Sequence, residues 1–259
     1  MQPDLLLRQR QNLIQDRLRQ SGRVLAADLA QEFSVSEDTI RRDLRELAAA
    51  GLCERVYGGA LPVAPGGTFA RRMGEAPERK AALALAALAF IKPGSTVFFD
   101  AGSTNLAIAR ALPDDLALTA VTNTPLIATV LVEKPEIDLI LVGGRVDRRV
   151  GAAIGAKAQR DIETLRPDLC LLGTCGADID AGLTVFEYED AEFKRFVARG
   201  SSAVLAAVTN DKLGTSAPHR VVAATGCAAL VFEHDAPADV TRPFEAIGVT
   251  IAHARKAHP

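Results

Sequence analysis

Residues 34–51, SVSEDTIRRDLRELAAAG, form a short helical pattern in which three arginines accompany four acids. Ser36 is suited to cap the helix, and Glu37 and Asp38 favour the positive end of its dipole. At 100° per residue, the apolar positions fall on one face and the arginines span an arc roughly opposite. The apolar positions are Ile40, Leu44 and Leu47, and the arginines are Arg41, Arg42 and Arg45.

The flanking residues extend this helix into a small unit. Apolar spacing predicts one helix over residues 4–20, ended by Gly22, and another over residues 24–33. After Gly51, which ends the third helix, two β-prone runs surround Gly58-Gly59 and predict a hairpin. Three helices and a hairpin make a winged helix-turn-helix, which we assign to residues 1–61.

Residues 62–77 are rich in proline, glycine and arginine without apolar periodicity, and they predict a linker. From residue 78 to 259, β-prone runs alternate with helical segments, which predicts a larger α/β domain with a mostly parallel sheet. The expected strands are residues 96–102, 116–123, 137–144, 169–175, 201–209, 220–224 and 229–233. The expected helices are residues 78–91, 103–112, 125–132, 153–165 and 188–199.

Composition limits the classes of function. The 259 residues are 48% hydrophobic and 24% charged, a typical balance for a globular protein. The longest apolar run, residues 81–91, is short of the ~20 residues that span a bilayer, and no secretory signal pattern opens the chain. We therefore expect a cytoplasmic protein without a membrane partner. The four cysteines and four histidines lack metal-ligand spacing, so we expect no metal and no cofactor.

Two interpretations of the third helix follow from its chemistry. A helix that enters the major groove of double-stranded DNA needs polar side chains on one outward arc, and arginine binds guanine bidentately. Ser36 and Thr39 would then lie near phosphates or bases, and the wing would contact an adjacent groove or strand through Arg55, Tyr57, Gly58 and Gly59. The alternative is a solvated face whose arginines pair with acids at helical spacing. The net charge of −2 counts mildly against DNA.

Residues 21–60, SGRVLAADLAQEFSVSEDTIRRDLRELAAAGLCERVYGGA, resemble the signature of DeoR-type bacterial transcription regulators almost throughout. The segment VSEDTIRRDL is the most specific part. The family has a glycine before the recognition helix where this chain has Ser34, a departure that leaves the apolar face and the arginines intact. The resemblance implies a DNA-binding regulator.

In the second domain the segment FFDAGSTN, residues 98–105, ends a strand in a small-residue loop that opens a helix. Free backbone N–H groups, two hydroxyls and the lack of bulk at Gly102 favour an anion there. A hydroxyl that simply caps the helix is the competing interpretation. The candidate residues of this loop are Asp100, Gly102, Ser103, Thr104 and Asn105.

The ends of the next two strands add further candidates, because open parallel sheets gather ligand contacts at their carboxyl edge. They are Thr122 and Asn123, and Gly143 and Gly144. Lys194 lies four residues after Asp190 on an expected helix, and Lys212 follows a strand. Each lysine could instead be an ordinary surface ion-pair residue.

The resemblance to DeoR-type regulators continues through these loops and covers nearly the whole chain. In that family the second domain is similar to ribose-5-phosphate isomerases and serves as a sensor for a phosphorylated sugar or related metabolite. The resemblance implies a repressor of a carbohydrate-utilisation operon, acting as a homo-oligomer, either dimer or tetramer, that releases operator DNA when the effector binds. The alternative is a sugar-phosphate isomerase or deaminase with a DNA-binding appendage, in which Asp100, Asp178 or Glu187 would be the base.

Overall fold

The computed structural model describes residues 7–21, 23–49, 52–62 and 69–256. Contacts within the chain define two compact units, Met1–Gly67 and Thr68–Pro259. Gly22 and Gly51, which we expect to end helices, and residues 63–68 of the expected linker lie outside the described residues. Each unit is considered by itself.

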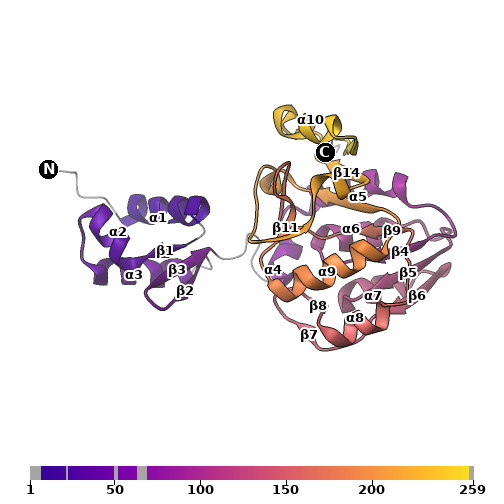
Figure 1. Cartoon of the computed structure of the whole chain (residues 1–259), viewed down its shortest axis with the longest axis horizontal. Coiled ribbons are helices and arrows are strands. Elements are labelled where there is room, and N and C mark those ends of the chain that lie inside the picture. Colours follow the sequence, from indigo (N-terminus) through magenta and orange to yellow (C-terminus); the bar gives the residue numbers. More distant parts are fainter. Residues whose placement is uncertain (1–6, 22, 50–51, 63–68, 257–259) are drawn as a thin grey trace. The chain divides into compact units, whose positions relative to one another are not determined.

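The first unit is a winged helix, as the sequence predicts (Figure 1). Three helices precede a hairpin, and a short strand joins the hairpin in an antiparallel sheet of order β1-β3-β2. The elements are α1 (Leu7–Ser21), β1 (Val24–Leu25), α2 (Ala26–Phe33), α3 (Glu37–Ala49), β2 (Cys53–Val56) and β3 (Gly59–Pro62).

The start of the second helix differs from the expectation. Val24 and Leu25 pair with Ala60 and Gly59 as strand β1, so α2 begins at Ala26 rather than at residue 24. Apolar spacing alone does not distinguish two extended residues from a first helical turn. The core of the unit contains the inner faces of all three helices, with Ile14, Leu18, Leu29, Ile40, Leu44 and Leu47 at 3% exposure or less.

The second unit is built on a seven-stranded sheet of order β15-β14-β12-β9-β4-β5-β6, in which every neighbouring pair is parallel. This confirms the α/β class. The strands are β4 (Thr96–Phe99), β5 (Leu118–Thr122), β6 (Ile137–Leu141), β9 (Leu169–Leu171), β12 (Val204–Val208), β14 (Ala229–Phe232) and β15 (Thr250–His253). From β4 the chain first builds the sheet toward β6 and then, from β9 onward, toward β15, so the order reverses between β4 and β9.

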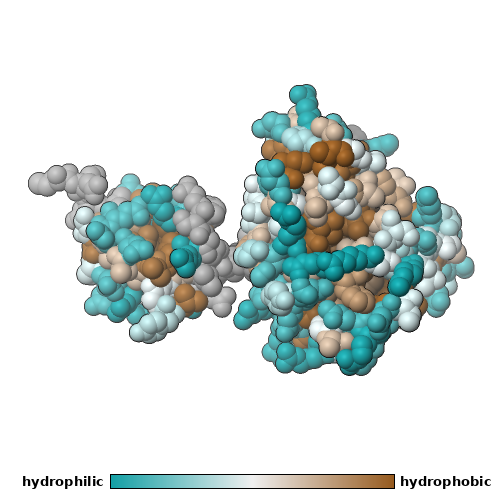
Figure 2. All heavy atoms as spheres, in the orientation of Figure 1, coloured by the Kyte–Doolittle hydropathy of each residue, from teal (hydrophilic) through white to brown (hydrophobic). Residues whose placement is uncertain are grey.

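Helices cover both faces of this sheet. One face packs against α5 (Pro77–Ala87), α6 (Ser103–Ala111) and α7 (Pro125–Leu131). The other packs against α8 (Ala156–Ile162), α9 (Tyr188–Gly200) and α10 (Ala238–Ala246). Phe98 and Phe99, neighbours on β4, enter opposite cores, which shows the alternation of side chains along a strand. Hydrophilic side chains line the outward side of α9 (Figure 2).

Two expectations about the strands are wrong in detail. Residues 220–224 do not join the parallel sheet, because β13 (His219–Val222) pairs with β11 (Gly182–Val185) in a separate antiparallel sheet with β10 (Gly176–Asp178). Only one side of β13 is buried, as is usual for antiparallel strands, whereas β12 is buried throughout. The seventh parallel strand is β15, whose short sequence carries little apolar signal.

The second unit begins before residue 78. Helix α4 (Phe69–Gly74) lies within residues 62–77, which we expect to be linker, and it packs against α6. Lys80 at the start of α5 donates hydrogen bonds of 2.5 Å to the carbonyls of Arg72 and Glu75. The part of this segment that follows residue 68 is therefore attached to the second unit.

Candidate DNA-binding and effector sites

Helix α3 begins as its sequence predicts. Ser36 Oγ accepts a hydrogen bond of 3.2 Å from the amide of Thr39, and the two hydroxyls lie 2.9 Å apart. Glu37 and Asp38 occupy the first turn, where the helix dipole favours negative charge. The capping Ser36 is exposed and Thr39 is half-buried, so both predicted contact residues lie at the accessible end of the helix.

The three arginines of α3 are exposed. Arg41 lies 2.8 Å from Glu37, and Arg42 lies 3.3 Å from Glu46, both at the i, i+4 spacing of a helix. Arg45 makes no ion pair with any described residue. Exposed pairs of this kind contribute at most about 1 kcal/mol, so the arginines can exchange their acids for phosphates or bases. Both interpretations of the helix are thus compatible with the free structure.

Helix α3 also forms a buried ion pair, between Asp43 and Arg10, which the sequence did not predict. Asp43 is 1% exposed and binds Arg10 of α1 through two hydrogen bonds, of 2.5 and 3.1 Å. The pair fixes α3 against α1, because a buried carboxylate needs its counter-charge. Thirty-three residues separate the two partners, so local spacing carries no signal for it.

The wing and the turn before α3 depend on unusual backbone conformations. Tyr57 is fully exposed at the hairpin tip beside Arg55, and Gly58 has a φ of +80°. A Cβ at Gly59 would lie 2.0 Å from the carbonyl oxygen of Val24, so only glycine fits there. Ser34 has a φ of 55° in the left-handed region, which explains why a glycine is favoured at this position.

In the second unit, Asp100 and Gly102 follow β4 at the carboxyl end of the sheet, next to Gly173 at the end of β9. The Gly173 amide donates a hydrogen bond of 2.8 Å to Asp100 Oδ2, and a Cβ on Gly102 would lie 3.6 Å from the Gly173 Cα. This is the point where the strand order reverses, and such switch points open a crevice for ligands in doubly wound sheets. Gly102 and Ser103 are half-buried at the N-terminus of α6.

A buried cluster of charges lies beneath this loop. Lys194 of α9 is 2% exposed, donates to Asp100 Oδ2 and has Asp190 Oδ1 at 3.5 Å. Burial, partly offset by Lys194, raises the pKa of Asp190 to about 6. Burial alone would lower the pKa of Lys194, but the charges of Asp100 and Asp190 outweigh it and raise that pKa. Lys194 is thus an interior ion-pair residue and not a surface one.

Four further predicted site residues are buried, and three of them hold the loops together through side-chain hydrogen bonds. The Asn105 amide donates to the carbonyls of Asp100 and Leu171, at 2.9 and 2.8 Å. Thr122 donates to the Phe99 carbonyl at 2.7 Å. Asn123 donates to the Ala153 carbonyl at 3.0 Å and thereby anchors strand β8 (Ala152–Ala153). Thr104 is likewise buried.

Lys212 differs from Lys194, because its ammonium group meets carbonyl oxygen and no carboxylate. Its Nζ donates 2.8 Å to the carbonyl of Thr174, the residue after Gly173, which brings the positive charge to the crevice. Lys80, which our sequence reasoning did not select, is 8% exposed and also binds only carbonyls. No carboxylate of the described residues lies within ion-pairing distance of either ammonium group.

The pKa values of Lys80 and Lys212 are consistent with this lack of carboxylate partners. Burial lowers the pKa of Lys80, and the nearby charge of Lys212 lowers it further. Burial lowers the pKa of Lys212, and the charges of Arg72 and Lys194 add to the effect. The charges of Glu75 and Asp211 raise the pKa of Lys80, and those of Cys175 and Asp211 raise the pKa of Lys212, but neither pair restores the ordinary value. The two ammonium groups thus lie in surroundings that disfavour their charged form.

Gly143 and Gly144 follow β6, and Gly144 lies beside Ala153, whose carbonyl accepts the hydrogen bond from Asn123. A Cβ on Gly144, which has a φ of +139°, would lie 3.5 Å from the Ala153 Cβ. Ala152 and Val150 pack against Ala101, between Asp100 and Gly102. Apart from Lys194 of α9, the predicted effector residues therefore lie at or after the carboxyl ends of β4, β5, β6 and β12. Gly102, Ser103, Lys212, Gly143 and Gly144 are at least partly accessible.

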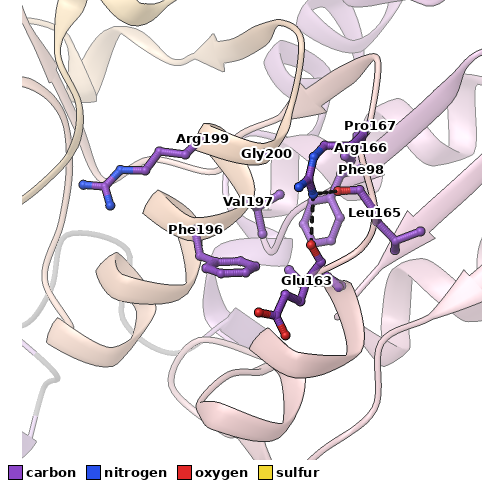
Figure 3. A pocket seen from close by; sticks show the side chains of 10 residues that line it. Phe98, Glu163, Leu165, Arg166, Pro167, Phe196, Val197, Arg199 and Gly200 are labelled. Carbon is purple, nitrogen blue, oxygen red and sulfur yellow. Dashed lines mark hydrogen bonds between the residues drawn. The ribbon is translucent and has the colours of Figure 1, made fainter.

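A cavity of about 440 Å³ lies elsewhere, between the end of α8 and the C-terminal turn of α9 (Figure 3). Phe98, Phe196 and Val197 line it, and the Arg166 guanidinium donates to the carbonyls of Glu163 and Leu165 beside it. None of the predicted effector residues lines this cavity. The Arg199 side chain points away from it in Figure 3.

Within the described residues, no helix is long and apolar enough to cross a membrane. The same residues contain no group of three or more histidine, cysteine or acidic side chains arranged to hold a metal ion.

A winged helix with an exposed, arginine-bearing third helix, followed along the chain by a doubly wound α/β unit, is the architecture of a transcription regulator with a sensor domain. Family models match both parts: residues 10–64 match the DeoR-like helix-turn-helix domain, and residues 75–234 match the DeoR C terminal sensor domain. The chain belongs to the DeoR family of DNA-binding transcriptional regulators.

Relatives support this assignment. The chain is 37% identical over 211 residues to the glycerol-3-phosphate regulon repressor of Escherichia coli, covering 81% of this chain and 84% of the relative. It is 34% identical over 226 residues to the HTH-type transcriptional regulator GlpR of Haloferax volcanii, covering 86% and 88%. Ribose 5-phosphate isomerase A of Methanocaldococcus jannaschii aligns over 52% of this chain and 54% of its own, with 14% identity and a TM-score of 0.39.

Proposed function

We propose that this protein represses a carbohydrate-utilisation operon and that a phosphorylated sugar or related metabolite releases it from operator DNA. The observation that carries the proposal is the pairing of an exposed arginine face in one unit with a basic crevice at the sheet switch point of the other. The named relatives, which include a glycerol-3-phosphate regulon repressor, support the carbohydrate class. We propose a winged helix over residues 1–61 and a sensor that begins with α4, so the linker expected over residues 62–77 is confined to the part that precedes α4.

For operator recognition, we assign base contacts to the arginines of α3 and backbone contacts to its first turn and to the wing. Arginine can bind guanine through two hydrogen bonds, whereas hydroxyls and glycine amides suit phosphates. The base-reading candidates are Arg41, Arg42 and Arg45. The positioning candidates are Ser36, Thr39, Arg55, Tyr57 and Gly58. Gly59, also expected to contact DNA, is buried where β3 pairs with β1 and shapes the wing instead.

For the effector, we assign the phosphate to the N-terminus of α6, at Gly102 and Ser103, beside Lys212 and Lys80. A dianion there meets free amide groups and two ammonium groups that lack carboxylate partners, so binding removes an unfavourable concentration of positive charge. Thr104, Asn105, Thr122 and Asn123 support the loops, and Gly143 and Gly144 border the sugar. Lys194 holds Asp100 in place from below and does not touch the phosphate.

Release of DNA requires that the effector bind the two states of the repressor unequally, since equal affinity would shift nothing. Helix α4 is the first described element after the linker, and the Arg72 carbonyl in it accepts a hydrogen bond from Lys80. An anion that binds Lys80 therefore acts on the segment that leads to the DNA-binding unit. We propose this route for the coupling.

The function proposed does not include catalysis. Asp100, one possible base in an isomerase, is occupied by Lys194 and the Gly173 amide. We further propose that the protein acts in the cytoplasm as a homo-oligomer. Incubation with ribose 5-phosphate or glucosamine 6-phosphate tests the enzymatic alternative, because product formation would support an isomerase or deaminase.

Gly102→Val tests the effector site. Gly102 has a φ of 171°, which any residue adopts, and a Cβ there would make ordinary contacts at 3.6 Å, so the fold accommodates the change. The added methyl groups would fill the entrance to α6. We expect the variant to bind operator fragments, selected from a random DNA pool, as tightly as wild type but to resist release by phosphorylated sugars and glycerol 3-phosphate. Equal release from both proteins would remove this loop from the site.

A further inference from the structure

The two borders of the seven-stranded sheet differ in composition. Figure 1 shows β6 at one border, and β15 forms the other. On β6 and the adjoining α7, the exposed fractions of Ile140, Leu141, Leu126 and Val132 are 37, 53, 42 and 68%. The exposed ends of β15 are Thr250 and His253. At the β15 border, Ile247 at the end of α10 is 41% exposed, so among the described residues the β6 border presents the larger set of branched apolar side chains to solvent.

The backbone of β6 offers unused hydrogen bonds along this border. The amide of Val142 donates to Thr122, and the carbonyl of Glu136 accepts from Leu118, so even-numbered residues face β5. Since amide and carbonyl groups alternate in direction along a strand, Leu139 and Leu141 turn both groups toward the open edge and Ile137 turns its carbonyl there. The Ile137 amide donates to the Lys134 carbonyl at 3.3 Å. An exposed edge of this kind normally carries lysine, proline or a bulge that prevents pairing with another chain, and β6 carries only Asp138.

The charges that flank β6 are arranged with opposite signs at its two ends. Glu133 and Glu136 precede the strand, and Arg145 and Arg148 follow it. All four are exposed, and none makes an ion pair with a described residue. An identical strand running antiparallel would bring the acidic end of each copy toward the basic end of the other. The edge is therefore complementary to itself about a two-fold axis.

We propose that the β6 edge is an interface with a second copy of this chain, in which the two strands pair antiparallel and join the two sheets into one. Pairing Leu139 with its counterpart in the second copy places Ile137 opposite Leu141. The two Leu139 residues then exchange hydrogen bonds, and the Leu141 amide of each copy donates to the Ile137 carbonyl of the other. Asp138 comes to lie opposite Ile140. Helices α7 of the two copies pack side by side over the joint and cover Leu126 and Val132. The inference rests on the proposed homo-oligomer but not on the identity of the effector.

Cysteine cross-linking of the full-length protein tests the register. In the proposed arrangement Asp138 and Ile140 of opposite copies form a pair whose Cα atoms are about 4.5 Å apart, which a disulfide can bridge. We expect the Asp138→Cys, Ile140→Cys double variant to form a covalent dimer on mild oxidation, whereas each single variant and the wild type remain uncrosslinked. Absence of the dimer, or equal cross-linking by the single variants, would overturn the register.

Charge reversal tests the interface without relying on its register. Analytical ultracentrifugation should show that the double variant Glu133→Arg, Glu136→Arg weakens self-association at least about tenfold. Adding Arg145→Glu and Arg148→Glu to this variant should restore self-association. Thr250→Lys on the β15 edge should leave self-association unchanged. An oligomeric wild type whose mass does not respond to the β6 variants would overturn the interface while leaving the proposed oligomer intact. A monomeric wild type would overturn both.

Discussion

The α3 surface and the sensor crevice both collect positive charge, but they hold it in different ways. Each of Arg41 and Arg42 is exposed and shares its charge with an acid one turn away. Lys80 is buried and Lys212 is half-buried, and their ammonium groups bind only carbonyl groups. Exposed charged side chains can change partners at little cost in free energy, which suits binding to a long polyanion such as DNA. Buried or half-buried ammonium groups without counter-ions instead favour one small anion.

Lys194 sharpens the comparison, because it is buried like Lys80 but fully paired. Replacing it with methionine, in Lys194→Met, would leave Asp100 buried without its counter-charge. We expect a loss of about 3–5 kcal/mol in the free energy of unfolding, measured by denaturant titration. The matched control is Lys157→Met, which removes an exposed pair with Asp161 and should change stability little. A loss no larger than the control's would show that the buried cluster is not needed.

The second expected effect is a pH dependence carried by Asp190. Its folded pKa of about 6 lies above the ordinary 3.8, so the folded state holds a proton that the unfolded state has already released. This contribution to stability is present below about pH 4 and disappears as the pH rises through 6, by up to about 3 kcal/mol. The free energy of unfolding of Asp190→Asn should therefore rise relative to wild type over this interval, and parallel pH profiles would contradict the assignment.

At the DNA-binding surface, Arg42→Ala and Arg45→Ala should weaken operator binding by about 1–3 kcal/mol each if they read guanine, with the loss confined to particular base pairs. A phosphate contact would instead lower the salt dependence of binding. Fluorescence anisotropy with operator variants measures both quantities. The exposed Arg160 in the sensor, changed to alanine, serves as the control, and unchanged affinity in both α3 variants would remove them from the interface.

The smallest expected effect concerns the turn before α3. Ser34→Gly removes the cost of a left-handed serine, offset in part by the greater freedom of glycine in the unfolded chain. We expect a gain of about 1 kcal/mol in the free energy of unfolding, measured by thermal or denaturant melting, with no change in operator affinity. A destabilised variant would mean that the Ser34 side chain contributes more than its backbone strain costs.

What the sequence predicts well is local. The apolar face of α3, its cap at Ser36 and the strand-loop-helix around Gly102 depend on residues within a few positions of one another. The sequence also indicates the α/β class through alternating periodicity. The direction of β13 and the edge strand β15 were missed, because short β-prone runs do not specify their partners.

The electrostatic roles of individual side chains were harder to predict for the same reason. Lys194 and Lys212 look alike as sequence, yet Asp100, 94 residues away from Lys194, neutralises only the first. Lys80 lies in a helical segment and carries no local signal of a ligand site. The Arg10–Asp43 pair joins helices that are distant in the chain. Each of these roles depends on tertiary contacts, which periodicity does not contain.

The most direct test of the account is to titrate operator complexes of wild type and Lys212→Gln with phosphorylated sugars, glycerol 3-phosphate and their unphosphorylated counterparts. Lys92→Gln, exposed before the amino end of β4, is the control. We predict that one phosphorylated compound releases wild type and the control at the same concentration, whereas its unphosphorylated form releases neither. Lys212→Gln should bind DNA normally but require at least about tenfold more ligand for release, which corresponds to a loss of about 1.4 kcal/mol in the free energy of ligand binding. Release of Lys212→Gln at the wild-type concentration would contradict the account.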